Sequence, residues 1–271
     1  MFINLTAIIR MSRYINFNNL NKAFNNFKYR KPFPFTIVDN FFRPSIAKRL
    51  EKEFPNYNDK FLHEYNNYCE VKKSSNNWNI FPPLTYKIFT ILNSEKFVKI
   101  ISKNLKISNL LSDYGLHGGG WHLMNKKGKL NPHLDYSSHP KTAVQRKFNL
   151  IIFLTKNWKK NWGGETCFYS KNNQNKKIPG KLSEKIYPKF NRAIFFDTSK
   201  SSWHGVDPIK IKKIRKSIAV YYLIKPTKFL IKRERALYAP TKNQIKNKKV
   251  SRFIKLRSNS NLFSRVYKLK K

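Results

Sequence analysis

Short apolar runs separated by Gly, Pro, Asn and Asp dominate the chain from residue 116 to residue 224. Such runs, with no long helical pattern between them, are typical of strands in an antiparallel sandwich or barrel. We expect strands at residues 121–124, 148–154, 165–169, 192–196 and 217–224. The pattern therefore predicts a mainly β core with an α+β organisation.

The N-terminal part of the chain has a different pattern. Residues 34–42 form a β-branched and aromatic run typical of a strand, and residues 45–54 carry apolar side chains at helical spacing. A second helical pattern covers about residues 84–105, after a polar, Asn-rich segment at 65–79 that we expect to be a loop. The two helical segments are predicted to support the sheet.

Three regions are expected along the chain. Residues 1–32 have no clear periodicity and are interpreted as an N-terminal extension, and residues 33–225 form the ordered domain. Residues 226–271 form a basic C-terminal extension with 15 Lys+Arg and a single acid, Glu234. Within this extension we expect a helix at residues 231–238 and disorder beyond Asn243.

The net charge of the chain is strongly positive, since 56 Lys+Arg against 14 Asp+Glu give +42. Lys, Asn and Ile, which AT-rich codons specify, account for 99 of the 271 residues, so we attribute much of this charge to composition. The basic extension has two interpretations: it contacts nucleic acid or an anionic membrane, or it is a solvated tail. We favour the tail, because the whole chain is basic.

The cysteines and the hydropathy of the sequence indicate in which cellular compartment the protein is expected. Cys69 and Cys167 lie far apart, which excludes a disulfide framework and fits a reducing environment. No run of 18 apolar residues occurs in the sequence. We therefore expect a cytoplasmic protein without a transmembrane segment.

Candidate metal ligands cluster in the middle of the chain, where four of the six histidines fall within 23 residues. In His133-Leu134-Asp135, one imidazole and one carboxylate would share a face of a strand, because alternate side chains point the same way. His204, 69 residues further on, would complete a set of two histidines and one carboxylate. This set leaves coordination positions open and is associated with non-haem Fe(II) oxygenases.

A candidate anion site follows His204. Arg215 and Ser217 open an apolar run and would share one strand face. A guanidinium binds a carboxylate through two hydrogen bonds, and the hydroxyl adds a donor. This pair would suit the far end of a dicarboxylic 2-oxo acid.

The pattern of His133, Asp135, His204, Arg215 and Ser217 resembles the Fe(II)- and 2-oxoglutarate-dependent dioxygenases of the prolyl 4-hydroxylase type. The resemblance covers about residues 33–225 and includes the segments 118–122, 148–154, 162–165, 190–192 and 198–205. It implies a double-stranded β-helix, a jelly-roll or cupin-like fold, with supporting N-terminal helices.

The same resemblance implies roles for these residues. His133, Asp135 and His204 would be the catalytic set that binds Fe(II), and Arg215 with Ser217 would bind the C5 carboxylate of 2-oxoglutarate. Turnover would use O2 and release succinate and CO2, with ascorbate as a further expected cofactor. Related halogenases lack the carboxylate, so Asp135 indicates a hydroxylase.

Other residues near this pattern have less definite roles. Contact with a metal ligand or the substrate is one interpretation of His122 and Trp203, and for His122 we favour the other, core packing or a satisfied hydrogen bond. His117 is interpreted as a packing residue and His139 as a loop residue near the mouth of the pocket. A tetrahedral zinc site built from the clustered histidines is disfavoured, because Pro132 and Pro140 interrupt the segment.

The substrate stays open at this point. Peptidyl proline, a free amino acid and a sugar moiety are all compatible with the residues of the site. The competing class of function is a non-catalytic basic binding module of the same fold, which would hold nucleic acid or another anionic polymer.

Overall fold

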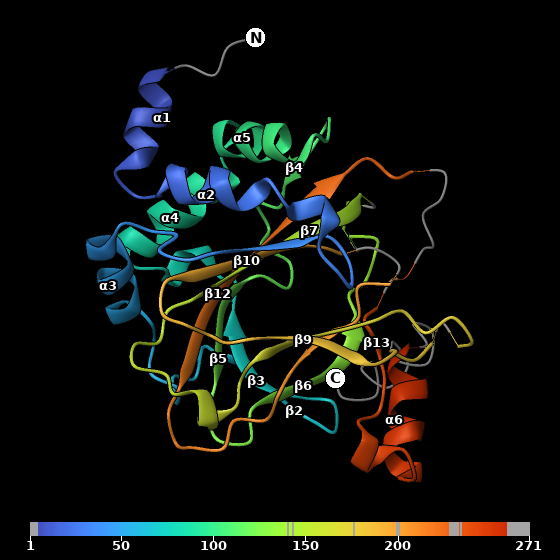
Figure 1. Ribbon diagram of the computed structural model, residues 1–271. Coiled ribbons are helices and arrows are strands. Elements are labelled where there is room, and N and C mark those ends of the chain that lie inside the picture. The colour runs from blue at the N-terminus through green and yellow to red at the C-terminus, as the bar shows by residue number, and fades with distance from the viewer. Residues whose placement is uncertain are drawn as a thin grey trace.

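The computed structural model describes residues 5–139, 141–142, 144–175, 177–198, 201–227, 233 and 235–258. A curled antiparallel sheet forms its centre (Figure 1). Strands follow one another across this sheet in the order β1 (Phe35–Val38), β10 (Arg192–Asp197), β7 (Gln145–Phe153), β12 (Arg215–Ile224), β5 (Gly120–Met124), β3 (Glu70–Ser75), β6 (Lys129–Leu134), β11 (His204–Val206), β8 (Thr166–Tyr169) and β9 (Leu182–Ile186). The sheet bends between its first and last strands, so the predicted double-stranded β-helix is confirmed.

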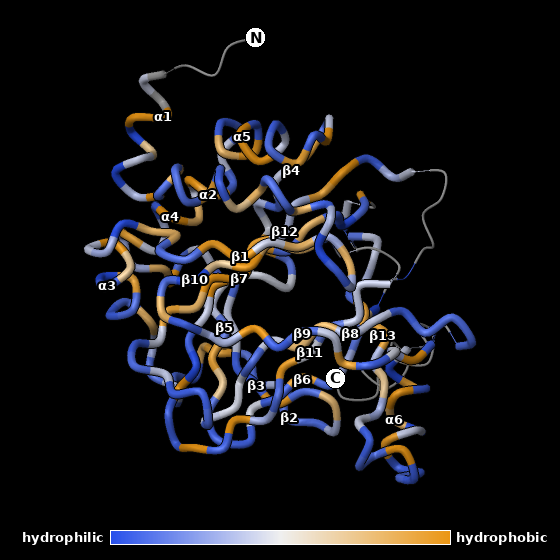
Figure 2. Tube along the Cα trace, in the orientation of Figure 1, coloured by the Kyte–Doolittle hydropathy of each residue, from blue (hydrophilic) through white to orange (hydrophobic). Residues whose placement is uncertain are grey.

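Three short strands extend this order at its sides. β2 (His63–Asn66) pairs with β3, β4 (Leu111–Ser112) with β12, and β13 (Leu237–Tyr238) with β6. Figure 2 shows apolar residues along β1, β10 and β7 and mostly polar residues in the peripheral loops. This distribution places the apolar core between the sheet and the helices.

Helices of the N-terminal region cover one face of the sheet, as expected (Figure 1). They are α1 (Leu5–Ser12), α2 (Phe17–Phe24), α3 (Pro44–Lys52), α4 (Pro83–Asn93) and α5 (Glu95–Leu105). The Ser94 side chain accepts a hydrogen bond from the Phe97 backbone N–H and so caps α5, which divides the predicted 84–105 helix into two. Short 3-10 turns lie at η1 (Phe27–Tyr29), η2 (Trp78–Ile80), η3 (Lys160–Trp162) and η4 (Lys242–Gln244).

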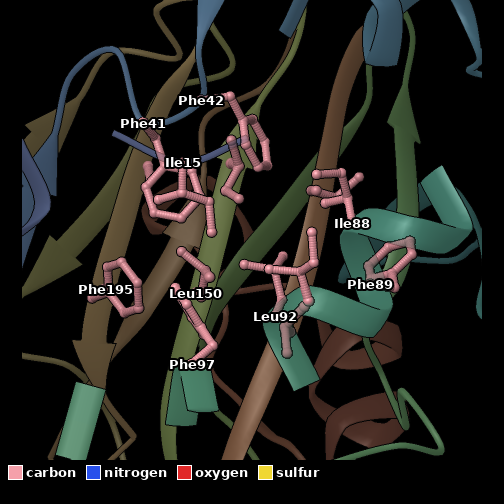
Figure 3. Close-up of a cluster of buried hydrophobic side chains, with 14 of the residues drawn as sticks. Ile15, Phe41, Phe42, Ile88, Phe89, Leu92, Phe97, Leu150 and Phe195 are labelled. Carbon is pink, nitrogen blue, oxygen red and sulfur yellow. The ribbon is translucent and has the colours of Figure 1, made fainter. Parts of the chain in front are cut away.

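The helices and the sheet share one apolar core (Figure 3). Phe89 and Phe97 from α4 and α5 belong to the same cluster as Leu150 of β7 and Phe195 of β10, and all four are fully buried. Complete burial of one such side chain stabilises the folded state by about 1.5–3 kcal/mol. This core holds the outer face of the strands rigid, while their inner face carries the polar residues of the site.

Two sequence-based expectations are wrong in the N-terminal half. Residues 65–79 are mostly not a loop, because β2 and β3 form a hairpin there and β3 pairs with both β5 and β6. Pairing with neighbouring strands outweighs the weak strand propensity of the local sequence. Residues 1–32 also contain a regular element, because helix α2 buries Phe17, Leu20 and Phe24 against the core.

The C-terminal extension also differs from expectation. The described part of residues 231–238 contains strand β13 in place of a helix, and helix α6 (Lys248–Ser258) follows beyond Asn243, where we expected disorder. Residues 228–232, 234 and 259–271 lie outside the described residues. β13 is extended because β3 pairs only with the start of β6, so β13 completes the hydrogen bonds of its end at His133 and Leu134, which local sequence does not reveal. In the described part of the chain, no helix is long and apolar enough to cross a membrane.

Candidate active site

The three predicted metal ligands converge at the inner face of the sheet. His133 lies near the end of β6, Asp135 follows directly, and His204 of β11 stands opposite His133 in the strand register. Their ligand atoms all lie within 4.8 Å of one another, and all three residues are buried. Asp135 Oδ1 is 3.8 Å from His133 Nε2, and Asp135 Oδ2 is 3.9 Å from His204 Nε2. Two imidazoles and one carboxylate therefore face a common point.

Backbone carbonyls orient both imidazoles. His133 Nδ1 lies 2.9 Å from the Asn131 carbonyl oxygen, and His204 Nδ1 lies 2.8 Å from that of Ser202. A carbonyl can only accept, so each Nδ1 carries the proton and each Nε2 presents its lone pair to the centre. Asp135 Oδ2 is buried without a protein hydrogen-bond partner. This donor set fits a divalent transition metal, which would occupy the unpaired lone pairs.

The protonation states agree with that fit. Burial, together with the neighbouring His204, lowers the pKa of His133 to about 3. For Asp135, burial raises the pKa, but His204, Arg146 and His133 together outweigh it and the net direction is downward. At neutral pH the site therefore presents a neutral imidazole at His133 and an ionised carboxylate, the forms that bind metals.

The predicted anion site lies on β12 beside this centre. Arg215 is buried, and its Nε donates to the Gly164 carbonyl at 2.8 Å. Its two terminal nitrogens lie 3.3 Å from Thr166 Oγ1 and 3.5 Å from Ser217 Oγ, which are long contacts for a charged group. The terminal N–H groups of the guanidinium can therefore donate stronger hydrogen bonds to a further acceptor.

A tight turn at residues 163–164 allows this arrangement. Gly163 and Gly164 have φ angles of +75° and +80°, which favour glycine. A Cβ at Gly164 would lie 3.1 Å from Cδ of Arg215. The turn therefore leads into β8 and also holds the Arg215 side chain.

One cavity of about 970 Å³ joins the two sites. His133, Asp135, His204, Arg215 and Ser217 all line it, together with the β2–β3 hairpin and parts of α6. Its volume is at the upper end of the range for small-molecule pockets, about 300–1,000 Å³. The cavity can therefore hold a small acid and a second, larger ligand side by side.

The other candidate residues separate into two groups. His122 lines the cavity from β5, opposite Ser217, and burial lowers its pKa to about 3. Trp203 lies in a small apolar cluster with Leu134 and Ala239, and it is not among the described residues that line the cavity. The structure thus brings His122, but not Trp203, to the cavity wall.

His117 and His139 do not join the metal-binding set. His139 is buried, and its Nε2 lies 3.6 Å from Asp113 Oδ1. The His117 ring packs against His139 and Tyr136, while its carbonyl accepts a hydrogen bond from Arg146. Among the residues that the structure describes, His133, Asp135 and His204 are the group placed to hold a metal ion.

Sequence reasoning missed Arg146 of β7, which contacts the metal-binding set. Its guanidinium lies between the rings of Tyr136 and Tyr221, 3.4 Å from each centroid. Nη1 is 3.9 Å from Asp135 Oδ1, and Tyr221 also hydrogen-bonds that carboxylate. A signal exists in the sequence, because Arg146 precedes an apolar strand just as Arg215 does.

Comparison with known proteins agrees with this geometry. Residues 119–223 match the family model described as the 2OG-Fe(II) oxygenase superfamily. A comparison with curated proteins finds no match. One similar solved structure is a Pseudomonas putida prolyl-4-hydroxylase, with 11% sequence identity, coverage of 77% of this chain and 100% of that chain, and a TM-score of 0.50. Another comes from the prolyl 4-hydroxylases of Phytophthora capsici, with 17% identity, coverage of 89% of this chain and 74% of that chain, and a TM-score of 0.53. A Trichoplax adhaerens prolyl hydroxylase is also similar (17%, 82% and 94%, TM-score 0.50).

These solved structures support the fold, and the family match covers the strands that carry the site. The match of residues 119–223 and the geometry of the site indicate a 2-oxoglutarate-dependent dioxygenase, a class that uses Fe(II), 2-oxoglutarate and O2.

Proposed function

We propose that the protein hydroxylates a carbon–hydrogen bond of a substrate bound in the 970 Å³ cavity. His133, Asp135 and His204 would hold Fe(II), and Arg215 with Ser217 would hold the C5 carboxylate of 2-oxoglutarate. The observation that carries the proposal is the convergence of three ligand atoms within 4.8 Å, in the cavity that Arg215 also lines.

The bound metal would supply O2 activation coupled to the decarboxylation of 2-oxoglutarate to succinate and CO2. The chain supplies a fixed ligand face, because the imidazoles are held through their Nδ1 protons and Asp135 stays ionised beside Arg146. Fixed ligands on one side leave the opposite side open to the co-substrates.

Arg215 has the properties that an anchor for a dicarboxylate needs. Burial lowers its pKa to about 10, so the guanidinium is still charged at neutral pH. In a buried setting, a charged hydrogen bond to a carboxylate is stronger than at the surface, because water does not compete. The anchored acid would direct its other end toward His133 and Asp135.

The space beyond this anchor favours an extended substrate. The cavity continues between the β2–β3 hairpin, where Tyr65 and Asn67 line it, and helix α6, where Phe253 lines it. A free amino acid would leave much of this length unfilled, so we place peptidyl proline first. A free amino acid and a sugar moiety are the alternatives. The similar Trichoplax adhaerens enzyme is described as a prolyl hydroxylase in complex with a peptide fragment.

Two measurements test the proposal. Anaerobic addition of Fe(II) and 2-oxoglutarate should produce a weak visible charge-transfer band, and His133→Ala or Asp135→Ala should abolish it, because each removes one ligand. Substrate-stimulated succinate release should then be screened with proline-containing peptides, amino acids and nucleotide sugars. The absence of both the band and succinate would contradict the proposal.

Ascorbate as a further cofactor and binding of nucleic acid or an anionic membrane by the C-terminal region stay predictions. The charge-transfer band can be recorded without ascorbate, so the metal site is testable independently. Binding to nucleic acid would appear as an affinity that falls steeply with salt.

A further inference from the structure

Part of the basic C-terminal region lies against the metal-binding residues. β13 pairs antiparallel with the end of β6, which puts Tyr238 opposite His133 and Leu237 opposite Leu134. The Ala239 N–H donates to the Pro132 carbonyl at 2.8 Å and continues the pairing. In Figure 1, β13 and α6 lie together beside β6. The strand that ends in the metal-binding motif is thus covered by a segment more than 100 residues away in sequence.

One contact between the side chains of the two segments is a ring stack on His133. The Tyr238 ring stacks on the His133 imidazole with a centroid distance of 5.0 Å and an interplanar angle of 22°. His204 packs against the same imidazole at 4.2 Å, and the Asn131 carbonyl holds its Nδ1. Without Tyr238, that face of the His133 ring would lose its packing partner, and rotation of the ring would meet less resistance.

A second contact fixes the loop after Asp135. Arg233 Nε donates to the Asp135 backbone carbonyl at 2.7 Å, and its backbone N–H donates to Ser137 Oγ at 2.8 Å. The Ser137 N–H donates in turn to the Arg233 carbonyl at 2.8 Å. The C-terminal segment therefore bonds to the chain on both sides of the metal-binding carboxylate.

Helix α6 fastens this segment to the β2–β3 hairpin. Arg257 Nη2 lies 2.7 Å from the buried Glu70 carboxylate, and its guanidinium lies over the Tyr238 ring at 4.8 Å. Burial raises the pKa of Glu70, but Lys72 and Arg257 outweigh it and the net direction is downward, so the pair is charged. Gln244 adds bonds to Asn131 and to the Tyr68 carbonyl. These contacts make a continuous support from the hairpin through Arg257 and Tyr238 to His133.

We propose that this C-terminal segment, residues 233, 235–239 and 242–258, is a wall of the active site in which Tyr238 is a positioning residue for His133. Arg235, Tyr238, Phe253 and Arg257 also line the cavity, so the segment bounds the space for the substrate. The inference rests on the proposed function only for the role of His133 as a metal ligand. The packing itself belongs to the metal-free chain.

The test compares Tyr238→Phe with Tyr238→Leu in the full-length protein, using Co(II) as the probe. Phenylalanine keeps the stacked ring, so the Co(II) dissociation constant should equal that of the wild type. Leucine removes the ring face, and the constant should rise by about tenfold, in the range seen when a partner of a metal ligand is lost. Affinity is measured well below the unfolding temperature of each variant, so a general loss of stability leaves it unchanged.

A second readout uses no metal. Amide hydrogen exchange of residues 133–138 should accelerate in metal-free Tyr238→Leu and stay at the wild-type rate in Tyr238→Phe. If Tyr238→Leu does not fold, Arg233→Met replaces it, because this variant removes the side-chain bond to the Asp135 carbonyl, together with the positive charge near that residue, and should accelerate the same amides. Unchanged Co(II) affinity and unchanged exchange would overturn the inference. A wild type that binds no Co(II) would overturn the proposed function, and the exchange result would then decide this inference by itself.

Discussion

Replacement of Arg215 by Gln should weaken 2-oxoglutarate binding strongly without removing a metal ligand. In the structure, the Arg215 Nε–H donates to the Gly164 carbonyl, while the two terminal nitrogens make only long contacts, at 3.3 Å to Thr166 and 3.5 Å to Ser217. In the proposed function, these two groups would be the donors for a carboxylate. The net worth of one charged hydrogen bond is about 1.5–3 kcal/mol, so loss of the pair costs about 3 kcal/mol or more.

That cost sets the size of the effect. At about 1.4 kcal/mol per tenfold, the dissociation constant of 2-oxoglutarate should rise by roughly a hundredfold or more in Arg215→Gln. Arg215→Lys keeps the charge but supplies a point donor, so we expect a rise of about tenfold. The assay is an anaerobic titration of the Fe(II)-loaded protein with 2-oxoglutarate, followed by the charge-transfer band, which needs no knowledge of the substrate.

A matched control is available on the same sheet. Arg192 of β10 forms an ion pair with Asp39 at 2.6 Å and is not among the residues that line the cavity, so Arg192→Gln should leave the titration unchanged. Thermal unfolding of each variant should be recorded first, because Arg215→Gln also deprives the Gly164 carbonyl of its donor. A folded Arg215→Gln protein with wild-type affinity for 2-oxoglutarate would refute the assignment of Arg215 as the anchor.

Two further predictions concern the turn and the histidines. Gly164→Ala should lower the free energy of unfolding by about 1–3 kcal/mol, because its φ of +80° is unfavourable for alanine and the new Cβ would lie 3.1 Å from Arg215; denaturant unfolding checks this, with Gly115→Ala as the control. The metal-free protein should lose stability as the pH falls from about 6.5 toward about 3. Burial lowers the pKa of His117 to about 4 and those of His122 and His133 to about 3, so the unfolded chain binds more protons in that window. The urea midpoint of unfolding should be lower at pH 5.5 than at pH 7.5, and equal midpoints would contradict this prediction.

The sequence by itself determined the parts of this protein that depend on local pattern. The apolar runs before and after the histidines predicted strands β5, β7, β8, β10 and β12, since strand formation follows from side chains that fit a buried pleated surface. The spacing of His133, Asp135 and His204 predicted a common centre, and their ligand atoms do converge. These features could be predicted because each needs only a short segment and the rule that alternate strand residues share a face.

Only the tertiary structure decided the contacts between segments that are distant in sequence. The polar segment that carries Glu70 became a strand because β2 pairs with one side of it, while β5 and β6 share the other side and receive its remaining hydrogen bonds. Arg146 became part of the site because Tyr136 and Tyr221 from two other segments enclose its guanidinium. Tyr238 reached His133 because β3 pairs only with the start of β6 and leaves its end open to β13. Such contacts are long-range pairings whose partners satisfy one another's hydrogen bonds and charges, and no local pattern of residues records which partner will be there.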